Sequence, residues 1–155
     1  MNDAGDARFS DADERPLRLR ALDPEDLRVV SALIQDSVTT VGDMAFLRRQ
    51  RRFAALVNRF RWEGPVRSPE RVRSMLVAEN VTAVRSQGIS PRDRDLVLSL
   101  LALDWEGQGD GPGRLRITLS GDGEMMVEAE ALEVTLTDVT RPYLAPSGRV
   151  PRHPD

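Results

Sequence analysis

The fold is decided by residues 114–136, RLRITLSGDGEMMVEAEALEVTL. Apolar and polar residues alternate on both sides of the glycine-containing turn Ser120–Gly123, and this pattern predicts a β-hairpin. In the second strand, residues 124–136, the apolar positions change parity between Ala131 and Leu132. A parity change within one strand indicates a β-bulge, and bulges bend strands. We therefore expect a strongly curled, barrel-like antiparallel sheet.

One helix is predicted ahead of the sheet. Asp23 is a favourable N-cap and Pro24 suits the first helical position, while Gly42 follows as a plausible stop. Helical spacing of the apolar residues predicts an amphipathic helix over residues 24–38, packed on the sheet. The residues expected on its buried face are Leu27, Val30, Ser31, Ile34 and Val38.

The other strands are indicated by period-two alternation or by continuous apolar runs. They are residues 17–21, 44–47, 53–62, 69–79, 81–89 and 96–103, the last extended by Trp105. Residues 69–79 also fit a short helix, but the β-rich run that follows them favours a strand. Residues 107–113 contain four glycines and one proline and predict a loop.

These elements predict a single α+β domain over residues 16–140. Residues 1–15 are predicted to form a disordered acidic tail, and residues 141–155 a Pro-rich C-terminal tail. A chain of 155 residues can bury a sizeable core without metal or disulfide support. Because no stretch approaches the length of a membrane-spanning helix and residues 1–15 lack the pattern of a signal peptide, we expect a cytoplasmic protein.

Composition excludes several kinds of chemistry. The sequence has no cysteine, which excludes disulfides and thiol nucleophiles. The single histidine, His153, lies in the predicted C-terminal tail, so we expect neither a histidine-based triad nor a zinc site with several histidines. All 22 basic residues are arginine, which excludes a lysine base. We therefore expect no cofactor and no metal, and favour a protein that is not an enzyme.

Charge is segregated along the chain. Residues 44–94 hold 12 arginines and four acidic residues, whereas residues 95–140 hold two arginines and 10 acidic residues. Such asymmetry is typical of an interaction surface, and also of neighbouring strands that pair opposite charges.

The sharpest candidate site is an arginine-rich hairpin. Arg48, Arg49, Arg51 and Arg52 lie in the link between two predicted strands, and Arg59 and Arg61 follow, interleaved with Phe60 and Trp62. Four guanidinium groups in one turn repel one another unless an anion lies nearby. They could pair with acidic side chains of the same fold, such as Glu124, Glu128, Glu130 and Glu133. An acidic protein partner or a homodimer would also serve, as would nucleic acid or phosphate. The sequence pI near 5.3 disfavours nucleic acid.

Two weaker candidates remain. Arg85, Ser86, Gln87 and Gly88 form a polar cluster that could bind a small anion, although such residues more often form a turn. The carboxylate pairs Asp104 with Glu106 and Glu128 with Glu130 could perform acid–base chemistry, but nothing in the sequence marks a cleft around them.

Five motifs of the chain resemble those of a known family. They are ALDPEDL (21–27), DMAFL (43–47), NRFRWE (58–63), VRSQGI (84–89) and LTD (136–138). The chain resembles, over about residues 16–140, a family of short, uncharacterised alphaproteobacterial proteins classed only as a domain of unknown function. The resemblance implies no activity, so no residue inherits a catalytic role from it.

The function expected from the sequence is a non-enzymatic interaction module that presents the arginine-rich hairpin to an acidic partner. The alternatives are a nucleic-acid or phosphate-binding protein and an enzyme with a carboxylate-based site. The enzyme requires a concave pocket with at least two acidic residues.

Overall fold

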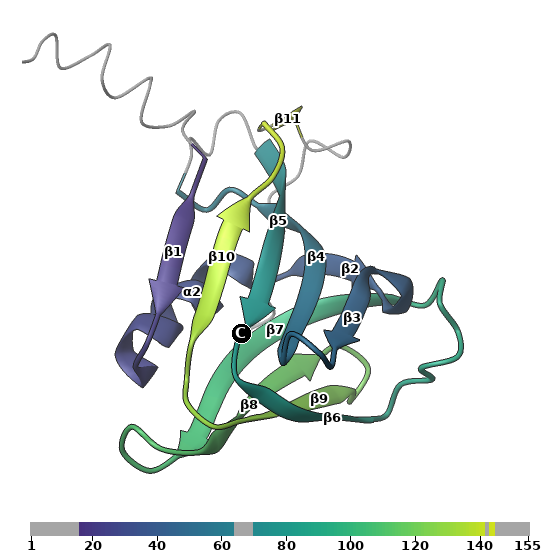
Figure 1. Cartoon of the computed structure of the whole chain (residues 1–155). Coiled ribbons are helices and arrows are strands. Elements are labelled where there is room, and N and C mark those ends of the chain that lie inside the picture. Colours follow the sequence, from purple (N-terminus) through teal and green to yellow (C-terminus); the bar gives the residue numbers. More distant parts are fainter. Residues whose placement is uncertain (1–15, 64–69, 142, 145–155) are drawn as a thin grey trace, which may run out of the picture.

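One antiparallel sheet and one α-helix make up the part of the chain described by the structure, a computed structural model that covers residues 16–63, 70–141 and 143–144 (Figure 1). The predicted N-terminal tail, residues 1–15, and residues 145–155 of the predicted C-terminal tail lie outside the described residues. Within residues 141–155, Tyr143–Leu144 form the short strand β11, which pairs with β5.

The sheet has 11 strands in the described part of the chain. They are β1 (Arg18–Ala21), β2 (Ser37–Thr40), β3 (Met44–Leu47), β4 (Arg52–Phe60), β5 (Glu70–Ala78), β6 (Val81–Gln87), β7 (Val97–Gly107), β8 (Gly113–Leu119), β9 (Glu124–Ala129), β10 (Val134–Asp138) and β11 (Tyr143–Leu144). Their order in the sheet is β1-β10-β5-β4-β2-β7-β8-β9-β6, and β3 and β11 pair beside this path with β4 and β5.

The sequence predicted a strongly curled, barrel-like sheet, and this prediction is wrong. The sheet is open, because the path of paired strands ends at β1 on one side and at β6 on the other. Register shifts typical of bulges do occur, between Val81 and Ala83 and between Leu100 and Ala102, but they do not close the sheet.

The parity change at Ala131–Leu132 has a different cause from the bulge that we predicted. Residues 124–136 are not one strand: β9 ends at Ala129 and β10 begins at Val134. β9 pairs with β6 and β8, whereas β10 pairs with β1 and β5 near the opposite end of the sheet. The parity changes because the chain leaves one part of the sheet and enters another.

The helix α2 (Pro24–Ile34) begins as the sequence predicts. The Asp23 side chain accepts a hydrogen bond from the backbone N–H of Asp26 at 2.8 Å, and Pro24 follows in the first turn. Leu27, Val30 and Ile34 are buried on the side that packs against the sheet. Each such side chain contributes about 1.5–3 kcal/mol by burial.

The helix ends earlier than the predicted residue 38. Asp36 adopts a left-handed conformation, with φ 64°, and its N–H donates to the carbonyl of Leu100 at 2.8 Å. The β-branched residues that follow then form β2, which pairs with β7 and with β4. Val38 is therefore part of the sheet and not of the helix face.

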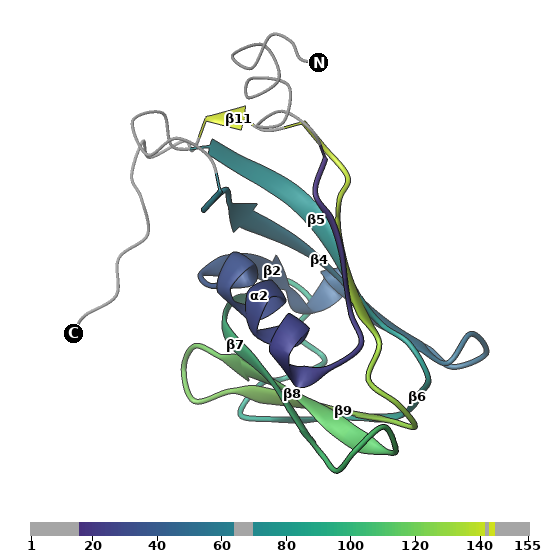
Figure 2. The same cartoon turned by 90° about the vertical axis from the view of Figure 1, so that its left-hand side faces the viewer.

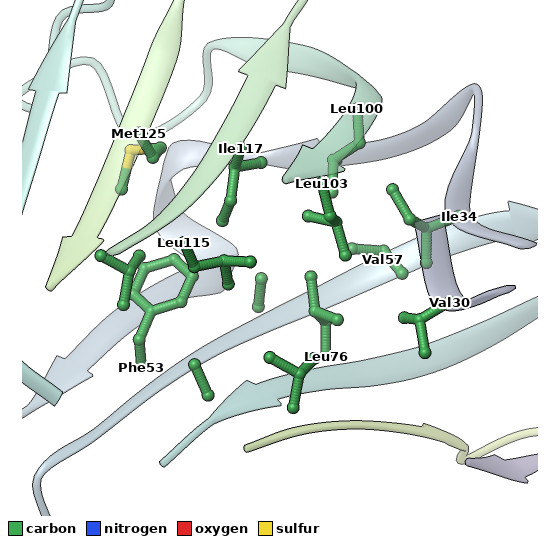
Figure 3. Packing of buried hydrophobic residues seen from close by; sticks show 14 of the residues in the cluster. Val30, Ile34, Phe53, Val57, Leu76, Leu100, Leu103, Leu115, Ile117 and Met125 are labelled. Carbon is green, nitrogen blue, oxygen red and sulfur yellow. The ribbon is translucent and has the colours of Figure 1, made fainter. Parts of the chain in front are cut away.

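The hydrophobic core lies between the helix and the sheet. Figure 2 shows α2 between β4 and β5 above and β7 and β8 below. Figure 3 shows Val30 and Ile34 of the helix facing Val57 and Leu103, with Phe53 and Met125 at the opposite side of the cluster. The hydroxyl of Ser31 also accepts a hydrogen bond from the Leu103 N–H, at 2.9 Å, which ties the helix to β7.

Several other predictions agree with the structure. Of the ambiguous residues 69–79, Glu70–Ala78 form the strand β5, as favoured from the sequence. The apolar run 96–103 and Trp105 lie in β7 except for Leu96, and residues 108–112 of the predicted Gly-rich loop connect β7 to β8, whereas Gly107 and Gly113 belong to the two strands and pair with each other. The hairpin of β8 and β9 turns at Ser120–Gly123, where Gly121 and Asp122 both have positive φ.

Candidate functional site

The turn between β3 and β4 carries the first four predicted arginines. Arg48 and Arg49 are exposed there. Arg51 forms an ion pair with Glu130, and the Nε of Arg52 lies 2.9 Å from Oε1 of Glu79. Glu130 is one of the acidic residues expected to neutralise the turn, whereas Glu124 pairs with Arg116 and Glu128 with Arg85. The fold therefore neutralises about half of the turn.

Arg59 and Arg61 do not belong to this exposed surface. Their exposed fractions are 0% and 3%, so neither side chain is accessible to a partner in the folded protein. The pairing of β4 with β5 places Arg59 on the same face as Val57 and Ala55, which is the core face of the strand. A charge on a core face requires ionic and hydrogen-bonding partners.

Arg59 obtains these partners from two neighbouring strands and from Glu63. Its Nη2 lies 3.0 Å from Oδ1 of Asp138 on β10, and its Nε donates to the Ser74 hydroxyl on β5 at 3.0 Å. Glu63 accepts two hydrogen bonds from the same guanidinium, at 2.9 and 2.7 Å. Ser74 donates in turn to Asp138 at 2.6 Å, and Asp138 accepts the Leu17 N–H at 2.9 Å. This cluster is a structural ion-pair network that joins β4, β5 and β10.

The network also determines how its charges titrate. Burial opposes ionisation of Glu63, but the hydrogen bonds and the charge of Arg59 outweigh burial and hold the pKa of this carboxyl below its ordinary value. Burial likewise opposes the charge of Arg59, yet Glu63 and Asp138 raise the pKa of its guanidinium. The signal that could have revealed the network is the parity of β4, which puts Arg59 among apolar residues.

A groove of about 380 Å³ lies between β3 and β6. Its floor is apolar and comes from β3, β4, β6 and β9, from the 3-10 helix Val41–Asp43 and from the loop after β6. The floor residues are Val41, Met44, Phe46, Phe53, Val84, Ile89 and Met125. Three arginines line the groove as well: Arg48 at the end of β3, Arg85 on β6, and Arg94 in the loop before β7. We call this site the β3–β6 groove.

The groove exists because the sheet does not close. β3 pairs with β4 only and β6 pairs with β9 only, so each strand has one edge without a neighbouring strand among the described residues. The two sides are held together at the ends. The Val81 N–H donates to the Arg51 carbonyl at 2.8 Å, and the Gly42 N–H donates to the Arg94 carbonyl at 2.8 Å.

The electrostatic character of the groove is positive. Its lining, as far as the described residues form it, contains no acidic residue. The Arg48 guanidinium lies over the Phe46 ring, 5.0 Å from the ring centroid, and Nη2 of Arg94 donates to the Gly42 carbonyl at 3.3 Å. Arg85 is 3.2 Å from Glu128, and its side chain is 75% exposed. A surface pair this exposed contributes about 0–1 kcal/mol, so Arg85 can exchange Glu128 for another anion at little cost.

The groove unites two sites that the sequence presented separately. Arg48 came from the predicted hairpin, and Arg85 and Ser86 came from the polar cluster; all three line the groove. Gln87 and Gly88 do not. Gly88 has φ 75°, and a Cβ there would lie 2.8 Å from the Asp122 carbonyl oxygen, so its role is to let the chain pass the β8–β9 turn.

Arg94 was missed by sequence reasoning. Arg94 lies two positions after Arg92, and in the sequence it looks like part of an ordinary polar loop. Two hydrogen bonds with Gly42, which is distant in sequence, hold it at the groove.

The predicted carboxylate pairs do not form acidic clefts. Two smaller cavities, of about 240 and 280 Å³, each contain a single carboxylate, Asp43 and Asp104 respectively. Glu106 accepts hydrogen bonds from Arg116 and Arg114, which lower the pKa of its carboxyl. Across residues 16–63, 70–141 and 143–144, no three histidine, cysteine or acidic side chains are grouped so as to hold a metal ion. The helix of this part of the chain is too short to cross a membrane.

Comparison with known proteins identifies a family. No curated protein and no solved structure matches the chain. The family described as "protein of unknown function (DUF2948)" matches residues 17–153, which includes every strand of the sheet and the helix. The match confirms the family resemblance seen in the sequence motifs and extends past residue 140. The chain therefore belongs to the DUF2948 family of proteins of unknown function.

Proposed function

We propose that this protein is a non-enzymatic interaction module whose β3–β6 groove binds an acidic partner. The observation that carries the proposal is an apolar floor lined by Arg48, Arg85 and Arg94, with no carboxylate in the lining. Each guanidinium group offers several hydrogen-bond donors in one plane and can bind a carboxylate in bidentate geometry. The floor can also bury apolar side chains of the partner, which adds a contribution to binding that a purely ionic surface lacks.

The arginines that remain accessible favour an acidic protein over nucleic acid. Arg59 and Arg61 are buried, and Arg51 and Arg52 already pair with glutamates. Arg48 and Arg49 remain at the turn, and Arg48 joins Arg85 and Arg94 around an apolar floor, which suits the apolar side chains of a protein better than a phosphate backbone. An enzyme with a carboxylate-based site lacks support as well, because each of the three cavities described above holds at most one carboxylate.

The experiment is a chemical-shift titration of the isotope-labelled full-length chain. The probes are seven-residue peptides of glutamate and apolar residues, and the same peptides with arginine in place of glutamate. We expect the acidic peptides to shift the amide resonances of Met44, Val84 and Arg94, and the basic peptides to leave them unchanged. Acidic peptides that shift none of these resonances contradict the proposal. A generic oligonucleotide that shifts them at lower concentration than any acidic peptide would replace it with the nucleic-acid alternative.

The cytoplasmic location expected from the sequence stays a prediction, and the partner proposed here would have to be present in the same compartment.

A further inference from the structure

We infer that the acidic partner of the β3–β6 groove binds as an extended segment that adds a β-strand to the free edge of β6, with apolar and acidic side chains in alternation. This inference rests on the proposed function and specifies the class of ligand. It follows from three features of the groove: its two strand edges, the direction of the side chains on those strands, and the positions of the arginines.

The first feature is the backbone at the groove walls. Among the described residues, β6 is the last strand on its side of the sheet, and β3 has β4 on one side and no strand on the other. A strand edge without a neighbour presents a row of N–H and C=O groups, which is a template for an added strand. The groove lies between two such edges, so the main chain of an extended segment can form hydrogen bonds there while its side chains occupy the floor.

The second feature is the parity of the walls. On β6, Val84 and Ser86 lie opposite the buried residues Val127 and Met125, so they share the inner face of the sheet; Val84 is half-buried, Ser86 is exposed, and both line the groove. On β3, Met44 and Phe46 lie opposite Ala55 and Phe53 and face inward in the same way. Every second side chain of an added strand would therefore point at this apolar floor. The residues between them would point to solvent.

The third feature is the charge around the groove. Arg85 follows Val84 on β6 and is on the outward face, where its side chain is 75% exposed. Arg48 lies just beyond the end of β3 with its guanidinium over the Phe46 ring, and Arg94 is held near Gly42 by hydrogen bonds; both line the groove. Outward side chains of an added strand pass Arg85 and lie in a groove that carries two more arginines, so they are expected to be aspartate or glutamate.

The same charge disfavours a second copy of this chain as the occupant. Pairing of β6 with β6 of another molecule would bring two copies of Arg85 onto one face of a continuous sheet. Like charges on neighbouring strands are destabilising. An acidic segment has the opposite charge and meets no such repulsion.

The test compares three libraries of seven-residue peptides for binding to the full-length chain, measured by fluorescence polarisation. In the first library acidic residues occupy every second position and apolar residues the others. The second has the same composition, with the acidic residues in one block. The third has arginine in place of the acidic residues. We expect the best alternating peptide to bind about tenfold more tightly than the best block peptide, and the third library not to bind.

A second measurement tests the backbone directly. N-methylation of every second amide of the best peptide removes one row of hydrogen bonds while keeping all side chains. We expect methylation at one parity to weaken binding about tenfold, and hydrogen exchange of the β6 amides to slow when the parent peptide binds. Methylated peptides of both parities that bind as tightly as the parent overturn strand addition.

The outcomes separate the two proposals. If block and alternating peptides bind equally, and reversal of Arg48 and Arg94 still abolishes binding, the strand addition is wrong and the acidic-partner function stands. If no acidic peptide of either order binds, both are wrong. If the chain alone forms a dimer through β6, seen by sedimentation and by slowed exchange of the β6 amides, the second copy replaces the acidic segment.

Discussion

Arg59 and Asp138 form an ion pair in which the arginine has no exposed surface, with Nη2 of Arg59 3.0 Å from Oδ1 of Asp138. The pair joins β4 to β10 across β5, and Ser74 on β5 contacts both partners. A charge in the core is tolerated here because every nitrogen of the guanidinium has an acceptor among Ser74, Asp138, Glu63 and the Phe60 carbonyl.

The first prediction concerns the loss of the Asp138 charge. Asp138→Asn keeps the size of the side chain but leaves Arg59 without its buried counter-charge, and we expect the free energy of unfolding to fall by about 3–5 kcal/mol. Urea denaturation measures this change. The control is Asp122→Asn in the β8–β9 turn, where φ is 63° and asparagine is equally suited. An Asp138→Asn variant as stable as the control would show that the network does not hold the strands together.

The second prediction concerns pH. Because the pKa of Glu63 is lower in the folded than in the unfolded state, the unfolded chain binds the proton first, and the stability contributed by Glu63 is lost as the pH falls through its folded pKa. Glu63→Gln should therefore cost about 1–2 kcal/mol at neutral pH, and the difference from wild type should shrink below about pH 4. Urea denaturation at a series of pH values measures it. Asp110→Asn in the exposed loop is the control, and a difference that stays constant with pH would contradict the prediction.

The third prediction concerns the loop between β7 and β8. A Cβ at Gly113 would lie 2.6 Å from both the Glu106 carbonyl oxygen and the Trp105 ring, whereas a Cβ at Gly111 would meet nothing closer than 3.9 Å. Gly113→Ala should destabilise the protein by about 1–3 kcal/mol through overpacking. Gly111→Ala should leave stability unchanged or raise it by about 0.4–1 kcal/mol. Thermal denaturation compares the two variants, and equal melting temperatures would show that Trp105 does not constrain Gly113.

Local structure was largely predictable from the sequence. The N-cap at Asp23 and the turn at Ser120–Gly123 depend on neighbouring residues alone, and the structure contains both. The end of the helix was not predictable in this way. Val38 continues the helical spacing, but Ser37–Thr40 gains more by pairing with β7 and β4 than by extending the helix.

The arrangement of the sheet depended on pairings between distant residues. Ala131–Leu132 looked like a bulge because a sequence does not show that β9 and β10 pair with different parts of the sheet. The same limit applied to the candidate site. The parity of β4 puts Arg59 on the face of Ala55 and Val57, but its partners on β5 and β10 are distant in sequence, and Arg94 reaches the groove through a hydrogen bond from Gly42. The sequence showed the turn at Arg48 and the cluster at Arg85 as separate features, but it did not show that the two lie in one groove.

The most direct test of the acidic-partner function compares two double variants with the same change in charge. Arg48→Glu with Arg94→Glu reverses two arginines that line the groove, and Arg49→Glu with Arg92→Glu reverses two exposed arginines beside them that do not. Affinity for the best acidic seven-residue peptide is measured for both at one ionic strength. We predict that the first variant binds about tenfold or more weakly and that the second stays within about threefold of wild type. Equal weakening of both would show that the arginines act only through net charge, and would contradict a binding site in the groove.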